Sequence, residues 1–303
     1  MTATAGTPPT ADPALSGART ELATSEERAA QRERLTLLLR SKVFIVGALI
    51  VLFWVFCAIF GRSIAPDNPF ATDVLNDLAE PGGGNLFGTD RLGRDVLSRV
   101  IVGARDILIV APLATILGTI VGVSLGLVTG YFRGTVDNFI SRFLDAFLAL
   151  PTVIIGLLAI VALGNSRWIV ILVIAAVFAP IIARTVRAAV LQEREMEYVA
   201  AAQLRNESTF YILFAEILPN VMGPILVEFT VRLGYAIFTV ATLSFLGFGI
   251  QPPAPDWGLQ VFDHYGLISG GYWWPVLFPS LAIATLVIGV NMMADGISKA
   301  FER

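Results

Sequence analysis

The sequence predicts an all-α polytopic membrane protein with six transmembrane helices. Hydrophobic residues make up 55% of the 303 positions and charged residues only 15%, whereas soluble domains carry about 25% charged residues. Several apolar runs reach the length of about 20 residues that a helix needs to cross a bilayer. Runs of this length favour helices over strands, because a helix satisfies its own backbone hydrogen bonds inside lipid.

The beginning of the chain differs from the rest. Residues 1–30 are rich in Thr, Ala, Pro and Ser, contain no apolar run and lack the hydrophobic stretch of a signal peptide. We expect them to form a disordered cytoplasmic tail, followed by a transmembrane domain over 31–303. Arginines and leucines alternate irregularly over 25–42. That mixture is typical of an amphipathic helix at a membrane surface, or of an ordinary charged flank to the first span.

Six apolar segments follow in order, separated by polar stretches. The two longest polar stretches are a loop at 61–106 and a second block at 191–220. Pro151 interrupts the third span, and Glu228 and Arg232 interrupt the fifth. The predicted spans are 43–60, 107–131, 139–163, 168–183, 221–250 and 273–294.

The distribution of Lys and Arg predicts that both termini are cytoplasmic. With the N-terminus inside, fourteen of the 21 Lys and Arg residues lie in the tail, the inner loops and the C-terminal end, and six lie outside. Five arginines of the loop 61–106 act against this rule. Acidic residues are interleaved with them, which indicates a folded, salt-bridged outer loop.

The block 191–220 carries the most informative motif. It contains a helix of small residues that begins at Glu197, a break at Asn206, and a second helix that Pro219 is expected to end. Small residues allow another surface to approach the backbone closely, and Asn adopts the left-handed conformation that a turn between helices requires. A projecting element of this kind suits docking into a groove on a partner.

This block resembles the EAA loop of the inner-membrane permeases of ATP-binding-cassette (ABC) importers. Asn206 stands where that motif has Gly, and Asn tolerates positive φ best among other residues, so we expect the turn to be kept. The resemblance implies that this segment couples the permease to its ATPase. The matching positions are Glu197, Ala201, Ala202, Ile217, Leu218 and Pro219.

Longer runs narrow the family. Residues 87–99, 243–258 and 273–279 are similar to the dipeptide/oligopeptide/nickel permease family, in particular to its C-type (second) permease subunit. The similarity extends over about 43–303. Val240 departs from it, since relatives often carry an acidic residue there, and a different substrate preference would follow if that residue lines the pathway.

This resemblance implies a type I ABC importer permease in a bacterial plasma (inner) membrane. The implied partners are a homologous second permease, two ABC ATPase domains and an extracytoplasmic solute-binding protein. ATP and Mg would be bound by the ATPase subunits, and we expect no cofactor, metal site or catalytic residue in this chain. No Walker motif is present, and the glycine-rich segment 82–93 lacks the Gly-Lys-Ser/Thr of a phosphate loop.

Several charged residues are candidates for function. Glu228 and Arg232 are four residues apart and share one helical face. At membrane depth such a pair either meets the charged ends of a peptide or forms a structural ion pair. Arg142 and Asp145 are expected to pair locally or to meet the ATPase. Arg91, Arg94 and Asp95 either contact the binding protein or start a salt-bridged helix.

Other residues favour structural roles. Glycines at 118, 122, 126 and 130 repeat every four residues, which predicts close helix packing. His264 is the single histidine, so it cannot form a histidine cluster for a metal, and with Asp256 and Asp263 nearby it is expected to be a loop residue. Cys57 is the single cysteine, so no internal disulfide is available.

Two alternative functions remain at this stage. The scaffold also suits nickel complexes or other small solutes, although the lack of His and Cys ligands argues against a bare metal ion. An ion-driven secondary transporter would call for several intramembrane carboxylates and broken helices in pairs. Apart from Glu228, and Asp145 and Asp295 near span ends, the predicted spans are almost free of acidic residues, and they contain no set of residues typical of an intramembrane enzyme.

Overall fold

The computed structural model describes residues 38–301, and every regular element within this range is a helix. The predicted tail 1–30 lies outside the described residues. Among the described residues, five helices are long and apolar enough to cross a bilayer. These are α2 (Lys42–Ile64), α3 (Val96–Tyr131), α6 (Arg167–Glu193), α10 (Met222–Phe245) and α12 (Trp274–Phe301).

The third predicted span is a bent pair of helices instead of one rod. α4 (Thr135–Leu148) and α5 (Thr152–Leu163) meet at an angle of 88°. Pro151 occupies the N-cap of α5, and a residue that precedes proline is disfavoured in helical conformation. The six predicted spans therefore correspond to five continuous helices and one bent pair.

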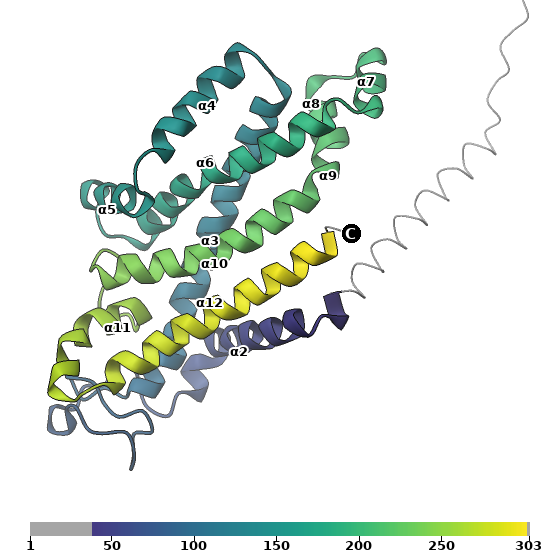
Figure 1. Ribbon diagram of the computed structural model, residues 1–303. Coiled ribbons are helices and arrows are strands. Elements are labelled where there is room, and N and C mark those ends of the chain that lie inside the picture. The colour runs from purple at the N-terminus through teal and green to yellow at the C-terminus, as the bar shows by residue number, and fades with distance from the viewer. Residues whose placement is uncertain (1–37, 302–303) are drawn as a thin grey trace, which may run out of the picture.

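Shorter helices connect the long ones at the two ends of the bundle. One end, which we name the α7 end, carries four of them: α7 (Glu197–Leu204), α8 (Thr209–Tyr211), η2 (Ile212–Ile217) and α9 (Leu218–Asn220). The other end, which we name the loop end, carries residues 65–95 and three more: η1 (Val74–Asn76), α11 (Trp257–His264) and η3 (Tyr265–Gly270). Figure 1 shows these groups at opposite ends of the long helices.

The extensive packing of α3 on α6 depends on the glycine repeat. A Cβ atom built on Gly122 would lie 2.7 Å from Cβ of Ile182, and one on Gly126 would lie 2.6 Å from Cβ of Val186. These distances are shorter than real Cβ contacts, so only glycine permits the observed approach. The predicted packing role of this repeat is confirmed.

A second close approach joins the first and last long helices. A Cβ atom on Gly47 of α2 would lie 2.6 Å from the carbonyl oxygen of Gly289 on α12. Nearby, Nε1 of Trp54 donates a hydrogen bond of 3.1 Å to Oγ1 of Thr285. Because α2 and α12 pack together, both ends of the described chain lie at the α7 end (Figure 1).

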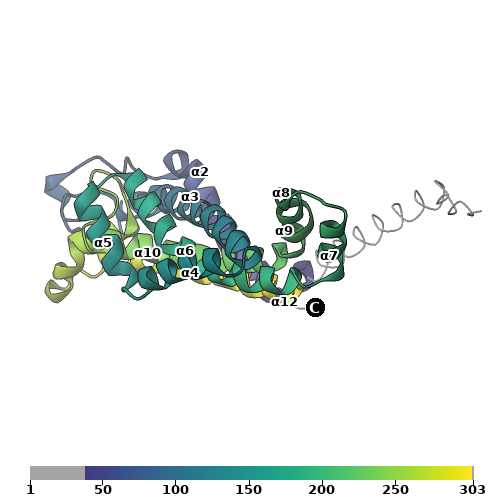
Figure 2. The same ribbon diagram turned by 90° about the horizontal axis from the view of Figure 1, so that it is seen from above.

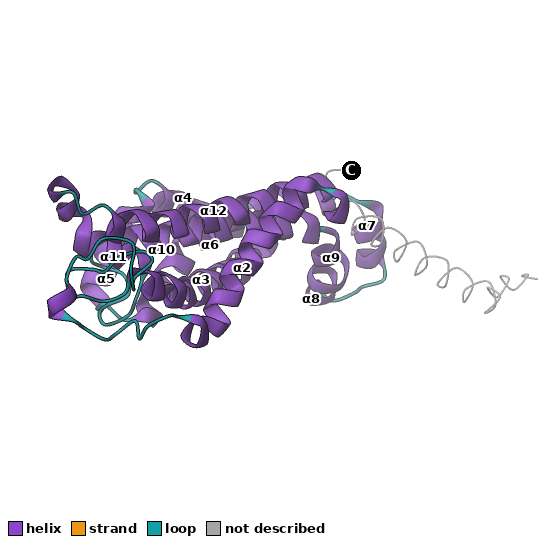
Figure 3. Ribbon diagram, turned by 90° about the horizontal axis from the view of Figure 1, so that it is seen from below, coloured by secondary structure: helices purple, strands orange, loops and turns teal. Residues whose placement is uncertain are grey.

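The bundle is elongated, and α10 runs along it in contact with α3, α6 and α12. Seen from above, α7 reaches past the end of α12, and α8 and α9 lie beside it, to one side of the long helices (Figure 2). Seen from below, the irregular segments gather mainly at the opposite end (Figure 3). The fold therefore separates a projecting helical element from a folded loop by the full length of the bundle.

The loop 65–95 is folded and ion-paired, as the interleaved charges predict. Arg94 Nε lies 2.7 Å from Oδ2 of Asp90, and Arg99 Nε lies 3.6 Å from the same oxygen. Arg99 also donates to the carbonyl oxygen of Pro69 at 3.0 Å. α3 begins well before the predicted start of the second span: Asp95 caps it, and Arg99, in its first turns, is buried and paired with Asp90 of the preceding loop.

Candidate functional site

The turn after α7 is built around Asn206. Asn206 has a φ of 56°, and its N–H donates to the carbonyl oxygen of Gln203 at 3.0 Å. The N–H of Glu207 donates to the carbonyl oxygen of Ala202 at 3.2 Å. This pair of bonds is the Schellman arrangement that ends a helix, so the expected left-handed turn is confirmed.

The two faces of α7 differ in burial. Val199 and Ala202 are fully buried, and they belong to the same apolar cluster as Ile212 and Ile217 of η2. Glu197, Ala201 and Leu204 point outward on the other face, which we name the α7 face. Leu204 is 85% exposed. Of the two motif alanines, Ala201 is therefore available to a partner and Ala202 holds the element together.

The second limb of the element differs from the prediction. Pro219 does not end a helix; it lies in the first turn of α9, directly after the π-helix η2. The N–H of Leu218 donates to the carbonyl oxygen of Leu213, one residue further back than in an α-helix. This wider turn is one way to accommodate a proline, which cannot donate. The chain therefore continues almost without interruption into α10, with Ile217 buried and Leu218 half-buried.

Polar bonds hold the element in place. Tyr198 donates to Oε2 of Glu193 at 2.7 Å, and burial together with this bond raises the pKa of Tyr198 to about 12. Arg205 reaches Glu207 at 3.5 Å and Glu216 at 3.3 Å across the turn. The α7 face is thus carried on a rigid support.

Exposed apolar residues also occur after the turn, on α8 and η2. Phe210 is 71% exposed, and its ring lies 4.4 Å from that of Phe214, which is also exposed. Large apolar side chains in an exposed cluster mark interaction surfaces. Sequence reasoning missed Leu204 and Phe210; the position of Leu204 seven residues after Glu197, on the same helical face, was the available signal.

Glu228 and Arg232 form an ion pair on α10, with 2.5 Å between Oε1 and Nε. Both side chains are mostly buried, and the guanidinium group of Arg232 lies 5.3 Å from the ring centre of Tyr235. The predicted pairing on one face is confirmed. Val240, farther along α10, is fully buried and belongs to the apolar core.

At the α7 end of α4 and α6, two further ion pairs join the helices. Asp137 accepts from Nε and Nη2 of Arg187 at 2.7 and 2.6 Å, a bidentate arrangement that is strong and directional. Asp145 lies 3.7 Å from Arg184, so its partner is Arg184 instead of the expected Arg142. The Asp137–Arg187 pair was not predicted.

At the loop end, the three candidate residues have different surroundings. Arg94 is bound to Asp90, and Asp95 caps α3 by accepting from the N–H of Ser98 at 2.7 Å. These two residues form the salt-bridged helix start that the sequence offered as an alternative. Arg91 is exposed, and within residues 38–301 it makes no ion pair.

His264 is not a loop residue as predicted. It ends α11, is buried, and its Nδ1 lies 2.6 Å from the carbonyl oxygen of Gln260. Burial lowers its pKa. Within residues 38–301, no group of three or more His, Cys, Asp or Glu residues could hold a metal ion.

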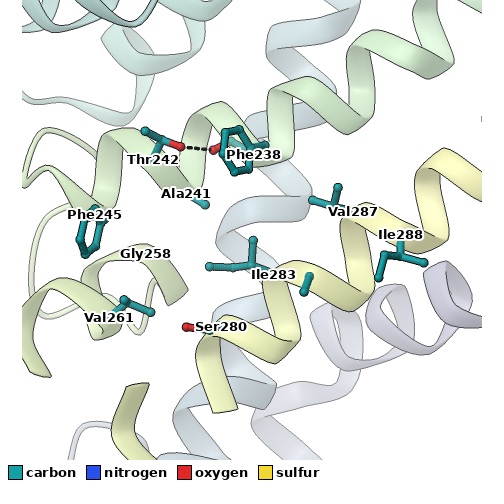
Figure 4. Close-up of a pocket in the computed structure, with 11 residues that line it drawn as sticks. Phe238, Ala241, Thr242, Phe245, Gly258, Val261, Ser280, Ile283, Val287 and Ile288 are labelled. Atoms are coloured by element: carbon teal, nitrogen blue, oxygen red, sulfur yellow. Dashed lines mark hydrogen bonds between the residues drawn. The ribbon is translucent and has the colours of Figure 1, made fainter. Parts of the chain in front are cut away.

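An apolar cavity of about 550 Å³ lies between α10, α11 and α12 (Figure 4). Phe238 and Phe245 of α10 border it, with Ile283 and Val287 of α12 opposite. Thr242 donates to the carbonyl oxygen of Phe238, so its hydroxyl is occupied within α10. The cavity therefore offers a mainly apolar surface and few polar groups that could bind or react with a ligand.

Comparison with known proteins places this architecture in a family. The family model for binding-protein-dependent transport system inner membrane components matches residues 122–303. A second family model, for the N-terminal transmembrane domain of oligopeptide transport permease C, matches residues 32–81.

Curated relatives match most of the chain. The dipeptide transport system permease protein DppC of Escherichia coli (strain K12) is 41% identical over 269 residues, which cover 87% of this chain and 89% of the relative. The di/tripeptide transport system permease protein DppC of Pseudomonas aeruginosa (strain UCBPP-PA14) is 37% identical over 262 residues, covering 84% of this chain and 86% of the relative.

A solved structure shares the fold. An inward-facing form of the MetNI methionine ABC transporter contains a chain that matches 68% of this chain and 97% of its own length, with a TM-score of 0.56 and 19% identity. From its family match and its relatives, this multi-pass membrane chain belongs to the binding-protein-dependent transport system inner membrane components.

Proposed function

We propose that this chain is the permease subunit of an ATP-driven importer for di- and oligopeptides, and that it forms half of the translocation pathway. The peptide substrate rests on the names of the relatives that are 37% to 41% identical. The coupling role rests on one observation: α7 lies at the end of the bundle on a support closed by a Schellman turn, with Glu197, Ala201 and Leu204 exposed.

The remaining subunits follow from this role. A homologous second permease completes the pathway, an extracytoplasmic solute-binding protein delivers the peptide, and two ABC ATPase domains bind ATP and Mg. This chain is itself non-catalytic. Its contribution is to convert movement of the ATPase domains into movement of its long helices.

We place the α7 end in the cytoplasm and the loop end outside. The Lys and Arg distribution supports this orientation, and both ends of the described chain lie at the α7 end. The ATPase domains then meet α7, and the binding protein meets the loop end. Of the three loop-end candidates, Arg91 is the most available to the binding protein, since Arg94 and Asp95 are held by internal bonds.

Force applied to α7 has a continuous route into the bundle. Val199 and Ala202 pack with η2, and η2 leads through α9 directly into α10. Closure of the ATPase pair would therefore move α10 together with α7. Because α10 carries Glu228 and Arg232, the same movement changes the exposure of this pair to the pathway, where the two charges would meet the carboxylate and amine of a peptide.

The test is ATP hydrolysis by the complex purified with its ATPase subunits, with and without peptide-loaded binding protein. Glu197→Ala and Ala201→Arg alter the α7 face and should abolish most of the stimulation by loaded binding protein while the complex remains folded. Gln203→Arg is the matched control, because Gln203 is exposed on α7 but points toward Tyr131. The proposal is wrong if the chain never co-purifies with an ATPase, or if the face variants couple as well as the control.

A further inference from the structure

Arg62, at the loop end, lacks an acidic partner within residues 38–301. Of the arginines predicted outside, Arg94, Arg99 and Arg167 each lie within 4 Å of a carboxylate. Arg62, Arg91 and Arg105 have no such contact. Arg62 and Arg105 line one cavity of about 560 Å³, which Arg167 and Asp106 also border.

This cavity carries excess positive charge. Among residues 38–301, Asp106 is the one carboxylate that lines it, and Asp106 already accepts from Nη2 of Arg167 at 2.5 Å. α6 begins at Arg167, so the positive end of a 27-residue helix also lies at the cavity. Two guanidinium groups and a helix start are therefore available to an anion.

A second cavity continues from the first. It also measures about 560 Å³ and shares Arg105 and Ile109 with the first. Apart from Arg105, its lining is apolar and comes from α2, where Val51, Val55 and Ile59 are spaced four residues apart, from the facing side of α3, and from Leu233 of α10. Because they share Arg105 and Ile109, the two cavities adjoin and make one groove along α2 and α3. It is basic at the loop end, where Arg167 and residues from the segment 250–255 also line it, and apolar below, where Leu233 of α10 also lines it.

The length of this groove corresponds to one leaflet of a bilayer. Val51 and Arg62 are eleven residues apart on α2, or about 16 Å at 1.5 Å per residue. Half of the hydrocarbon core of a membrane is about 15 Å. The flank of α2 beside the groove is apolar and exposed at Phe56 and Phe60, a surface suited to contact with lipid.

We propose that this groove binds one anionic phospholipid. Its phosphate lies between Arg62 and Arg105, where guanidinium groups donate charge-assisted hydrogen bonds, and an acyl chain follows the apolar lining toward Val51. A peptide fits less well, because its amine would need a free carboxylate and Asp106 is engaged by Arg167. The site depends on the chain spanning a membrane and not on the transported substrate.

Native mass spectrometry of the detergent-purified complex tests this proposal. The probes are dioleoyl phosphatidylglycerol and dioleoyl phosphatidylcholine, which share acyl chains and differ in net charge. Wild type should retain phosphatidylglycerol about tenfold more tightly than phosphatidylcholine, and the double variant Arg62→Gln/Arg105→Gln should lose this preference. Arg91→Gln, which removes an unpaired arginine of the loop end outside the groove, should keep it.

Two competitors distinguish other occupants. Glycerol 1-phosphate carries the phosphate without the chains and should fail to displace phosphatidylglycerol; displacement would identify a site for small phosphate esters. Dialanine should also fail, and displacement by it would identify a substrate site. Either displacement, or equal retention of phosphatidylglycerol by wild type and the double variant, overturns the lipid proposal. The measurement reads lipid retention, so its outcome is separate from that of the ATP hydrolysis test.

Discussion

Asn206 combines a left-handed backbone with an exposed side chain. Left-handed conformation costs most residues about 1–2 kcal/mol, and Gly and Asn are the least affected. The turn closes α7 through two backbone bonds, so its stability determines how firmly the α7 face is held.

We expect Asn206→Gly to preserve the turn and Asn206→Val to destabilise it by about 1–2 kcal/mol, because a β-branched residue is strongly disfavoured at positive φ. Amide hydrogen exchange of residues 197–207 in the purified complex measures the turn directly. The Val variant should exchange faster and the Gly variant should resemble wild type. Equal exchange in the two variants would contradict the assignment.

Asp256 is a second residue of interest, because its burial makes the stability of the fold depend on pH. It is fully buried at the N-cap of α11, where its Oδ1 accepts from the N–H of Leu259 at 2.9 Å. Burial raises its pKa from 3.8 to about 6. A carboxyl group with a raised pKa stabilises the folded state fully below pH 4, and this contribution is lost as the pH rises through 6.

Wild type should therefore lose thermal stability between pH 4 and pH 7 relative to Asp256→Asn. Asn keeps the N-cap hydrogen bond and does not titrate, so it isolates the charge. Unfolding midpoints of both proteins in detergent across this range provide the measurement. Parallel curves for the two proteins would show that Asp256 ionises without cost.

The conformation or exposure of some residues could be predicted from their type, and that of others could not. The positive φ of Asn206 followed from the sequence because few residues suit a turn in place of glycine. The exposure of Leu204 and Phe210 did not follow, because an apolar residue alone indicates a core position as readily as a docking surface. His264 was assigned to a loop because the acidic residues beside it gave no sign of burial.

At the scale of elements, the α3–α6 interface depends on glycines of α3, which have no side chain to keep the two helices apart. Its glycines allow helix backbones to approach in a membrane, where the hydrophobic effect contributes little to association. The same residue type on α5 has a different environment: a Cβ atom on Gly156 would lie 3.7 Å from its nearest neighbour.

Gly126 and Gly156 make a matched test of this packing, because one is in a tight contact and the other is not. Gly126→Ala should destabilise the folded chain by about 1–3 kcal/mol, because the added methyl group would overlap Val186. Gly156→Ala should be neutral or slightly stabilising, since Ala favours helix and has room here. Unfolding by sodium dodecyl sulfate in mixed micelles measures both. Equal losses in both variants would contradict the packing argument.

The helix boundaries that depend on the length of an apolar run were predicted well. Those that depend on contacts with other parts of the protein were predicted poorly. The apolar core of each span followed from composition. The early start of α3 did not, because Arg99 and Asp106 indicate a loop until their partners Asp90 and Arg167 are known. Pro151 was recognised in the third span, but a proline alone did not predict two separate helices at an angle of 88°.

At the scale of the whole molecule, the projecting α7 element and the folded loop occupy opposite ends. Their separation makes the orientation in the membrane measurable with two positions. Leu75 of the loop end is 99% exposed, and Leu204 of α7 is 85% exposed. Cys57 is buried, so the native thiol gives little background.

We expect Leu75→Cys to react with a membrane-impermeant maleimide in spheroplasts, where the outer face of the membrane is accessible. Leu204→Cys should react only after the membrane is permeabilised. Gel shift of the labelled chain reports both reactions, and the unsubstituted chain is the control. The reverse pattern of labelling would invert the proposed orientation and place α7 outside.

The bend between α4 and α5 also has a consequence for the lifetime of a newly synthesised subunit. α5 has twelve residues and is about 18 Å long, too short to cross a hydrocarbon core of about 30 Å. Helix ends at such depth leave backbone groups that lipid cannot satisfy, so this region needs protein against it. A subunit synthesised without its partner permease should therefore be a substrate for membrane proteases. Pulse-chase labelling should give it a shorter lifetime alone than when both permeases are produced together, and equal lifetimes would mean that the chain covers its own bend.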